Sequence, residues 1–228
     1  MRALVLATVM TACSGEVDPE WQLDHDRVIA VRMTPPHLAA GETATIDVML
    51  GRKGAPPEVV DPATATVESP VALMPYLRRS TDGHWSIAAA SDADLAAART
   101  ELGVADGDPV PVSVRMVLAY EGLIAHKLVY MGDHADNPAL GAVLVDGVDA
   151  TGETSLSVTE ATKISLSVDF AEPDDVTWLT SCGTMHDYDL PTAYLRVEPE
   201  DPHEGTLGVV VRDTSGGVVW QFWPISAP

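Results

Sequence analysis

Three oxygen-bearing side chains stand close together near the middle of the chain, at Asp133, Asp136 and Asn137. Calcium takes about six to eight oxygen ligands from carboxylates, side-chain amides and backbone carbonyls, so this spacing could hold that ion. The surrounding segment GDHADNP contains no apolar residue except Ala135. The alternative is a solvated linker in which an Asx turn precedes Pro138. On either interpretation, the composition indicates a boundary between two domains.

The pattern Asp-x-x-Asp-Asn-Pro resembles the interdomain linker of cadherin-like tandem β-sandwich proteins. That resemblance implies that calcium binds between the domains and stiffens their junction. This sequence departs from the family pattern, because His134 and Ala135 occupy the intervening positions.

The segment 172–204 concentrates further reactive groups, with nine acids against a single base. Cys182 precedes His186 and Asp187 in it, and a thiol, an imidazole and a carboxylate could form a metal site or a Cys–His pair. The spacing matches no zinc pattern, however. The alternative is an acidic loop at the rim of a sandwich, where a binding module keeps its contacts. Those contacts would come from four consecutive residues: His186, Asp187, Tyr188 and Asp189.

The C-terminal strand supplies one aromatic candidate for a binding residue, Trp223. Adjacent strand residues point to opposite faces, so Trp223 lies on the outside if Trp220 and Phe222 belong to the core. An exposed Trp223 could form a platform for a carbohydrate ring. Alternatively, Trp223 packs on the neighbouring domain.

Other kinds of chemistry are excluded by what the sequence lacks. It contains no Gly-x-Ser-x-Gly elbow, no Gly-rich phosphate loop and no His-Glu-x-x-His helix. The lone Cys182 beside Trp178 is typical of a small buried hydrophobic residue. The formal net charge of −21 repels phosphate backbones and excludes nucleic acid as a partner. We therefore expect no enzyme, and no cofactor apart from the calcium considered above.

The first sixteen residues indicate where in the cell the protein is located. They read MRALVLATVMTACSGE. Arg2 precedes a short apolar run, and Cys13 follows small residues directly. This arrangement resembles a bacterial lipoprotein signal, which implies removal of residues 1–12 and acylation of Cys13. Ser14 in place of Asp implies, by the same resemblance, an outer-membrane location. The alternative is an apolar N-terminal strand that contains a cysteine.

The segment after the cysteine is acidic. Residues 13–26 carry Gly and Pro and show no helical or strand period. We expect this segment to be a flexible tether, unless Trp21 packs on the first domain.

Most of the remaining sequence alternates apolar and polar residues with a period of two, which is typical of half-buried strands. The clearest strand is 164–170, and two hairpins join 110–121 to 123–131 and 205–213 to 217–223. One helix is predicted over 91–102, with Ser91 as its N-cap and Gly103 after its end. Gly-Glu-Thr precedes a strand at 41–43 and again at 152–154, a hint of duplication.

We therefore predict an all-β protein of two immunoglobulin-like β-sandwiches with one short helix in the first. Domain 1 spans 27–132, a linker spans 133–138 and domain 2 spans 139–228. The Pro35-Pro36 stop, the Gly41-Glu42 turn and the Thr-rich strand after it resemble the opening of many bacterial immunoglobulin-like domains.

The whole chain resembles bacterial surface lipoproteins built from such tandem domains. The resemblance implies an exported protein held to the outer membrane by lipid, facing the periplasm or the cell exterior. Its function would be non-enzymatic binding or scaffolding, as an accessory subunit with an envelope or surface protein as partner. The contacts are expected on domain 2, held away from the membrane by the tether and domain 1. The alternatives are a calcium-dependent adhesin and an enzyme or metal-binding protein that uses Cys182, His186 and Asp187.

Overall fold

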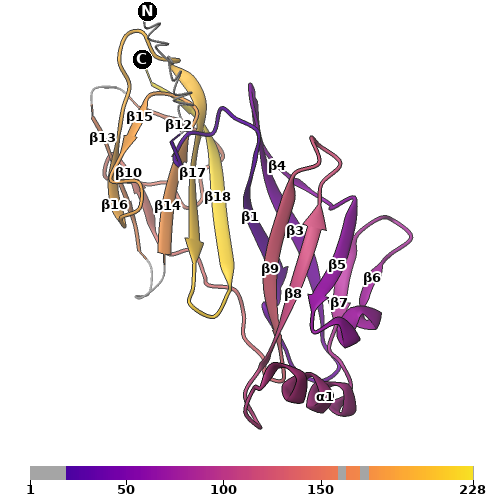
Figure 1. Ribbon diagram of the computed structural model, residues 1–228. Coiled ribbons are helices and arrows are strands. Elements are labelled where there is room, and N and C mark those ends of the chain that lie inside the picture. Colours follow the sequence, from indigo (N-terminus) through magenta and orange to yellow (C-terminus); the bar gives the residue numbers. More distant parts are fainter. Residues whose placement is uncertain (1–18, 159–162, 170–174, 228) are drawn as a thin grey trace, which may run out of the picture.

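The computed structural model describes residues 19–158, 163–169 and 175–227, and these form two β-sandwiches with one α-helix (Figure 1). The strands of the first sandwich lie within 27–131 and those of the second within 143–226. The prediction of an all-β fold with two sandwiches is confirmed. Cys13, the signal at 1–12 and the acids Glu172 and Asp174 lie outside the described residues.

Domain 1 has two sheets with the orders β1-β3-β7-β6 and β2-β9-β8-β5, and β4 pairs with β3. Its strands are β1 Arg27–Thr34, β2 His37–Leu38, β3 Thr43–Arg52, β4 Ala55–Val60, β5 Thr64–Ser69, β6 Leu77–Arg79, β7 Trp85–Ala88, β8 Val110–Val117 and β9 Ile124–Met131. The short β2 runs parallel to the last strand, β9. In immunoglobulin letters these orders read A-B-E-D and A′-G-F-C, which is the arrangement of an immunoglobulin-like sandwich.

Domain 2 repeats this order in the sheets β10-β13-β16-β15 and β12-β18-β17-β14, with β11 added beside β10. Its strands are β10 Val143–Val145, β11 Val148–Asp149, β12 Leu156–Ser157, β13 Ile164–Val168, β14 Asp175–Thr180, β15 Thr184–His186, β16 Thr192–Arg196, β17 Glu204–Arg212 and β18 Val218–Ser226. Here too the short A′ strand, β12, is parallel to the last strand, β18. Two immunoglobulin-like domains of one topology therefore make up the described chain.

The Gly-Glu-Thr motif does not mark equivalent positions in the two domains. At 41–43 it turns the chain between β2 and β3, whereas at 152–154 it precedes β12, the A′ strand of domain 2. The two copies thus occupy different places in the fold, and the motif reflects turn chemistry.

The helix α1, Asp92–Leu102, follows β7 as predicted. The Ser91 side chain accepts a hydrogen bond from the Asp94 amide, and Gly103 ends the helix with a φ of 68°. A short 3₁₀ helix, η1 (Val71–Tyr76), packs beside it. Among the described residues, no helix is both long and apolar enough to cross a membrane.

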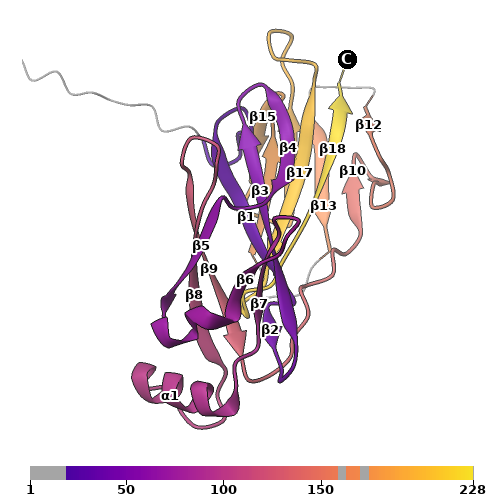
Figure 2. The ribbon, with the colours of Figure 1, turned by 90° about the vertical axis from the view of Figure 1, so that its right-hand side faces the viewer.

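The two domains pack face to face. The outer face of β1 and β3 covers the outer face of β14, β17 and β18, so the four sheets lie in successive layers (Figures 1 and 2). Seven buried apolar residues form this contact, with Trp220 and Phe222 partly buried against them: Leu23, Ile29, Ala30, Met49, Leu179, Val210 and Val218. Apolar sheet-on-sheet contact of this kind fixes the orientation of the domains.

The prediction that Trp223 faces outward is wrong. Its side chain is fully buried in the core of domain 2, and its Nε1 donates to the carbonyl of Ala150 at 3.1 Å. Because side chains alternate along β18, Trp220 and Phe222 face domain 1 instead. The Arg32 guanidinium lies 4.1 Å from the centroid of the Trp220 ring.

The prediction of a flexible tether over 13–26 is wrong for its described part, 19–26, where residues 21–26 bond to both domains. The Leu23 amide donates to the Thr180 carbonyl at 2.8 Å, and the Thr180 amide donates to the Trp21 carbonyl at 2.9 Å. Leu23 is buried between the domains, and Trp21 packs against the core of domain 2. Trp21 and Leu23 therefore fix the N-terminal segment to domain 2. Asp24 and Asp26 fix it to domain 1, because they accept the Gly54 and Lys53 amides at 2.7 and 2.9 Å.

We expect Val210→Asp to uncouple the domains. Val210 belongs to the apolar cluster between the domains and not to the core of domain 2, so a carboxylate there would be an uncompensated buried charge that costs about 3–5 kcal/mol. Calorimetry of the unaltered protein should give one transition, and the variant should give two. Val148→Asp is the matched control, because Val148 is 69% exposed. A single unshifted transition in the Val210 variant would contradict a coupling interface.

Candidate functional site

The predicted contact residue His186 lies on the outer sheet of domain 2. It stands opposite Tyr194 in the pairing of β15 with β16. The two rings are stacked, with centroids 4.4 Å apart and an interplanar angle of 11°. Lys163 places its Nζ 4.5 Å from the Tyr194 centroid, and Arg196 forms an ion pair with Glu198 at 2.8 Å. We call Lys163, His186, Tyr194 and Arg196 the Tyr194 surface.

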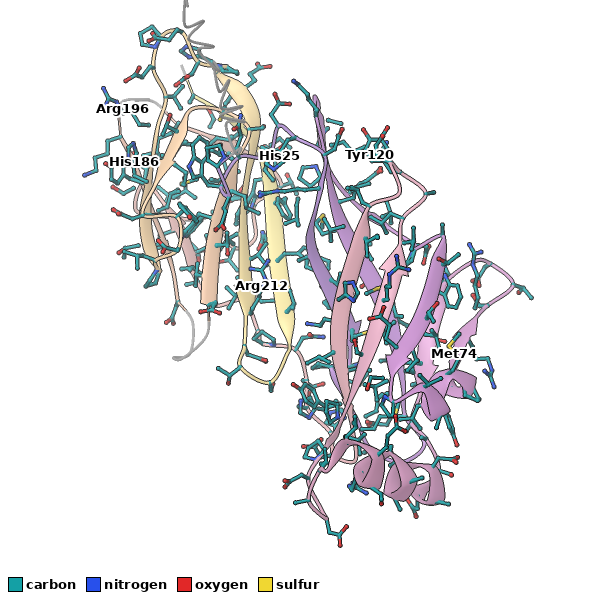
Figure 3. The ribbon with its side chains drawn as sticks, in the orientation of Figure 1. His25, Met74, Tyr120, His186, Arg196 and Arg212 are labelled. Atoms are coloured by element: carbon teal, nitrogen blue, oxygen red, sulfur yellow. The ribbon has the colours of Figure 1, made fainter. Side chains whose placement is uncertain are left out.

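The Tyr194 surface is open and is flanked by two hollows. One, of about 420 Å³, is bounded by Lys163, Tyr194, Arg196 and the segment 197–200. The other, of about 390 Å³, extends from Tyr194 past the serines of β13 to Leu144. Figure 3 places His186 and Arg196 on the side of domain 2 away from domain 1. This arrangement suits recognition of a partner by charge and ring contacts.

The rest of the predicted contact run does not converge on this surface. Asp187 adopts a left-handed φ of 55° in a turn and borders one hollow. Tyr188 points the other way, and its hydroxyl donates to the Glu20 carboxylate at 3.3 Å. The charge of Glu20 raises the pKa of Tyr188. Asp189 is exposed. Only His186 and Asp187 therefore belong to one surface.

Cys182 is buried and does not pair with His186, whose ring is stacked on Tyr194 instead. Its Sγ lies 3.6 Å from the Thr180 hydroxyl, and burial raises the pKa of the thiol. A raised pKa keeps the thiol neutral and poorly nucleophilic. Across the described ranges, no group of three or more His, Cys, Asp or Glu side chains is placed to hold a metal ion.

Asn137 joins the two domains through both atoms of its amide. Its Nδ2 donates to the Met33 carbonyl at 2.9 Å, and its Oδ1 accepts the Val218 amide at 2.8 Å. Asp136 instead points to solvent, with a carboxylate oxygen 3.4 Å from the ring of His134. Asn137 therefore acts as a structural bridge, and calcium binding at the junction stays a prediction.

Asp133 bonds a buried histidine that the sequence did not single out. His37 is only 8% exposed, and its Nδ1 lies 2.8 Å from Asp133 Oδ1. Its Nε2 lies 2.9 Å from the carbonyl oxygen of Ser215 in domain 2. A carbonyl and a carboxylate both accept hydrogen bonds, so both contacts form together when the imidazole carries two protons. The three predicted calcium ligands thus take different partners.

Two cations complete the polar contacts between the domains. Arg212 donates from Nη1 to Thr177 Oγ1 at 3.1 Å and from Nη2 to the Ile29 carbonyl at 3.0 Å. Lys127 donates from Nζ to the Gly216 carbonyl. Burial lowers the pKa of Lys127 to about 8 and also lowers the pKa of Arg212. Figure 3 shows Arg212 between the domains. The sequence contained one signal that could have identified Lys127 as unusual, because a lysine there occupies a core-facing position of its strand.

Comparison with known proteins yields no match among protein-family models or curated proteins. Solved structures that align with the chain include the two that follow. Murine CEACAM1b is 10% identical over 87% of this chain and 100% of its own, with a TM-score of 0.29. The N-terminal Ig1-2 module of the Drosophila receptor protein tyrosine phosphatase DLAR is 9% identical over 90% of this chain and 99% of its own, with a TM-score of 0.31. The classification as immunoglobulin-like rests on the strand order of each domain.

We expect Asn137→Ala to lower the free energy of unfolding by about 1–3 kcal/mol, because the Met33 carbonyl and the Val218 amide lose their partner. The loss should be the same in calcium and in EDTA, measured by chemical denaturation. Asp136→Ala is the control, since the Asp136 side chain is 88% exposed. If calcium occupies the junction, EDTA will instead lower the melting temperature of the unaltered protein, and Asp136→Ala will remove that effect.

Proposed function

We propose that this chain is an exported, lipid-anchored and non-enzymatic binding module, acting as an accessory subunit of an envelope assembly. The observation that carries the proposal is the apolar contact that locks two immunoglobulin-like domains into one rigid body. Rigid tandem sandwiches hold a contact surface at a fixed place and orientation. The signal-like N-terminus with Cys13 supports the anchor.

The proposed anchor determines which end of the molecule faces the membrane. The chain from Cys13 to the residues fixed on domain 2 can extend by at most roughly 30 Å. Because Trp21 and Leu23 bond Thr180, the end of domain 2 next to them would lie near the membrane. The α1 end of domain 1 would then be the far end (Figure 1). This is the reverse of the sequence-based expectation, in which domain 1 separates domain 2 from the membrane.

The Tyr194 surface is the contact surface that we assign. It is the sheet face of domain 2 that domain 1 leaves uncovered, and it gathers Lys163 and Arg196 in a chain with a net charge of −21. Exposed Leu144 and Val148 lie on or beside the same sheet. Cations, a stacked ring pair and apolar neighbours together suit a protein partner. Since the rigid body is anchored through domain 2, this surface would face sideways, toward a neighbour in the same membrane.

The anchor is tested by labelling. Cells given a radiolabelled fatty acid should label the unaltered protein, which should fractionate with membranes. Cys13→Ser should lose the label and leave the membrane fraction, because no other site offers a thiol outside a protein core. An unlabelled protein that fractionates with soluble material would contradict the anchor.

The contact surface is tested separately by photocrosslinking in the same cells. A photoreactive residue at position 194 should capture one envelope protein in fixed proportion, and Lys163→Glu should abolish the capture. A photoreactive residue at position 101, exposed on α1, is the matched control. Equal capture at positions 194 and 101, or capture insensitive to Lys163→Glu, would contradict this assignment.

A further inference from the structure

A cleft of about 480 Å³ lies between the domains, on a side that shares no residue with the Tyr194 surface. Its walls come from β1 and β9 of domain 1, and from β14, β17 and the hairpin after β17 in domain 2. We call it the seam cleft, and its polar or edge residues are Ile124, His126, Lys127, Asp175, Arg212 and Asp213.

The seam cleft holds two partly buried cations that repel each other. The nearby charge of Arg212 adds to burial in lowering the pKa of Lys127. In the described ranges, no carboxylate lies within ion-pair distance of Lys127 or Arg212. Their hydrogen bonds to carbonyl oxygens and to one hydroxyl leave both positive charges uncompensated.

The acids that line the cleft form no ion pair with these cations within the described ranges, although the charge of Asp213 partly opposes the lowering of the Lys127 pKa. The Asp213 Oδ1 accepts hydrogen bonds within its own hairpin. It accepts from the amides of Ser215 and Gly217 at 2.9 and 2.6 Å and from the Ser215 hydroxyl at 2.8 Å. Asp175 is exposed and acts on Arg212 only at longer range. His126 is turned to Glu68, with which its Nδ1 pairs at 3.1 Å. The cleft therefore offers positive charge to a ligand.

The part of the domain 1 wall that β9 forms is an open strand edge. The Tyr130 amide bonds the Pro36 carbonyl, so amides of even-numbered residues in β9 point away from β8. The parallel pairing with β2 covers only Tyr130 and Met131. The main-chain groups of Ile124 and His126 have no hydrogen-bond partner among the described residues. An unpaired edge of this kind accepts an added strand.

We propose that the seam cleft binds an extended acidic peptide from a partner protein. The peptide backbone pairs with the edge of β9 at Ile124 and His126, and one of its carboxylates lies between Lys127 Nζ and the Arg212 guanidinium. Charge-assisted contacts to Lys and Arg are among the strongest polar contacts in proteins. Charge complementarity favours an acidic occupant, because two cations of this protein without ion-pair partners lie beside the open edge. The site is independent of the lipid anchor and of the Tyr194 surface.

The test is calorimetric titration of the full chain with acetyl-VEVDV-amide. The peptide acetyl-VQVNV-amide, which replaces each carboxylate by an amide, should bind at least about tenfold more weakly. Lys127→Gln should cause a similar loss, and its side-chain amide can still donate to the Gly216 carbonyl, so the fold is retained. Lys163→Gln, which removes a cation from the Tyr194 surface, should bind the acidic peptide unchanged.

Two further measurements separate the strand edge from the charge. The acidic peptide with N-methylated valines cannot donate to β9 and should bind at least about tenfold more weakly. Binding should also fall as the pH rises from about 7 to about 9, because the Lys127 ammonium is charged below its lowered pKa and neutral above it. Lys127→Gln should remove that pH dependence. If inorganic phosphate binds the cleft while neither peptide does, or if Lys127→Gln and Lys163→Gln behave alike, the proposal is overturned.

Discussion

The burial of the outer face of β17 and β18 against β1 and β3 is the contact on which the rest of this structure depends. Without domain 1, Val210, Trp220 and Phe222 would form an apolar sheet face open to water, which domains of this size rarely tolerate. Because the face is covered, the two sandwiches have one fixed relation. That relation creates the seam cleft, holds Leu23 between the domains and turns the N-terminal segment onto domain 2. The proposed anchor and both proposed sites follow from it.

The apolar contact is non-directional, so the register of the two sheets must come from elsewhere. It comes from polar groups around the rim. His37 and Arg212 each bond a main-chain group of the other domain, and Asn137 in the linker bonds a main-chain group of both domains. Only one alignment of the sheets permits all of these contacts. Such contacts add little net stability, since each polar group loses hydration as it is buried. Their contribution is specificity, and the lowered pKa of Lys127 and of Arg212 reflects the loss of hydration.

Local patterns in the sequence predicted the parts of the fold that local physics decides. Alternation identified β8 and β13 because one face of each strand is buried and the other is not. Ser91 and Gly103 located α1 because capping is a property of neighbouring residues. The same reasoning failed for β18, since both of its faces are covered and alternation cannot say which face is the core. It also failed at the junction, because the partners of its polar residues are remote in sequence: His37 and Ser215 are 178 residues apart.

The two domains share one strand order, yet a face that is covered in one domain is exposed in the other. The residues on these faces differ accordingly. The A′-G-F-C face of domain 2 carries Trp220 and Phe222 and is covered. The same face of domain 1 carries Glu68, paired with Arg115 and His126, and these exposed ion pairs belong to a hydrated surface. The A-B-E-D face of domain 2 is neither fully apolar nor neutralised, since Lys163 meets a ring instead of a carboxylate. The two domains offer equivalent frameworks, and the side chains on each face decide which face closes the molecule and which remains available to a partner.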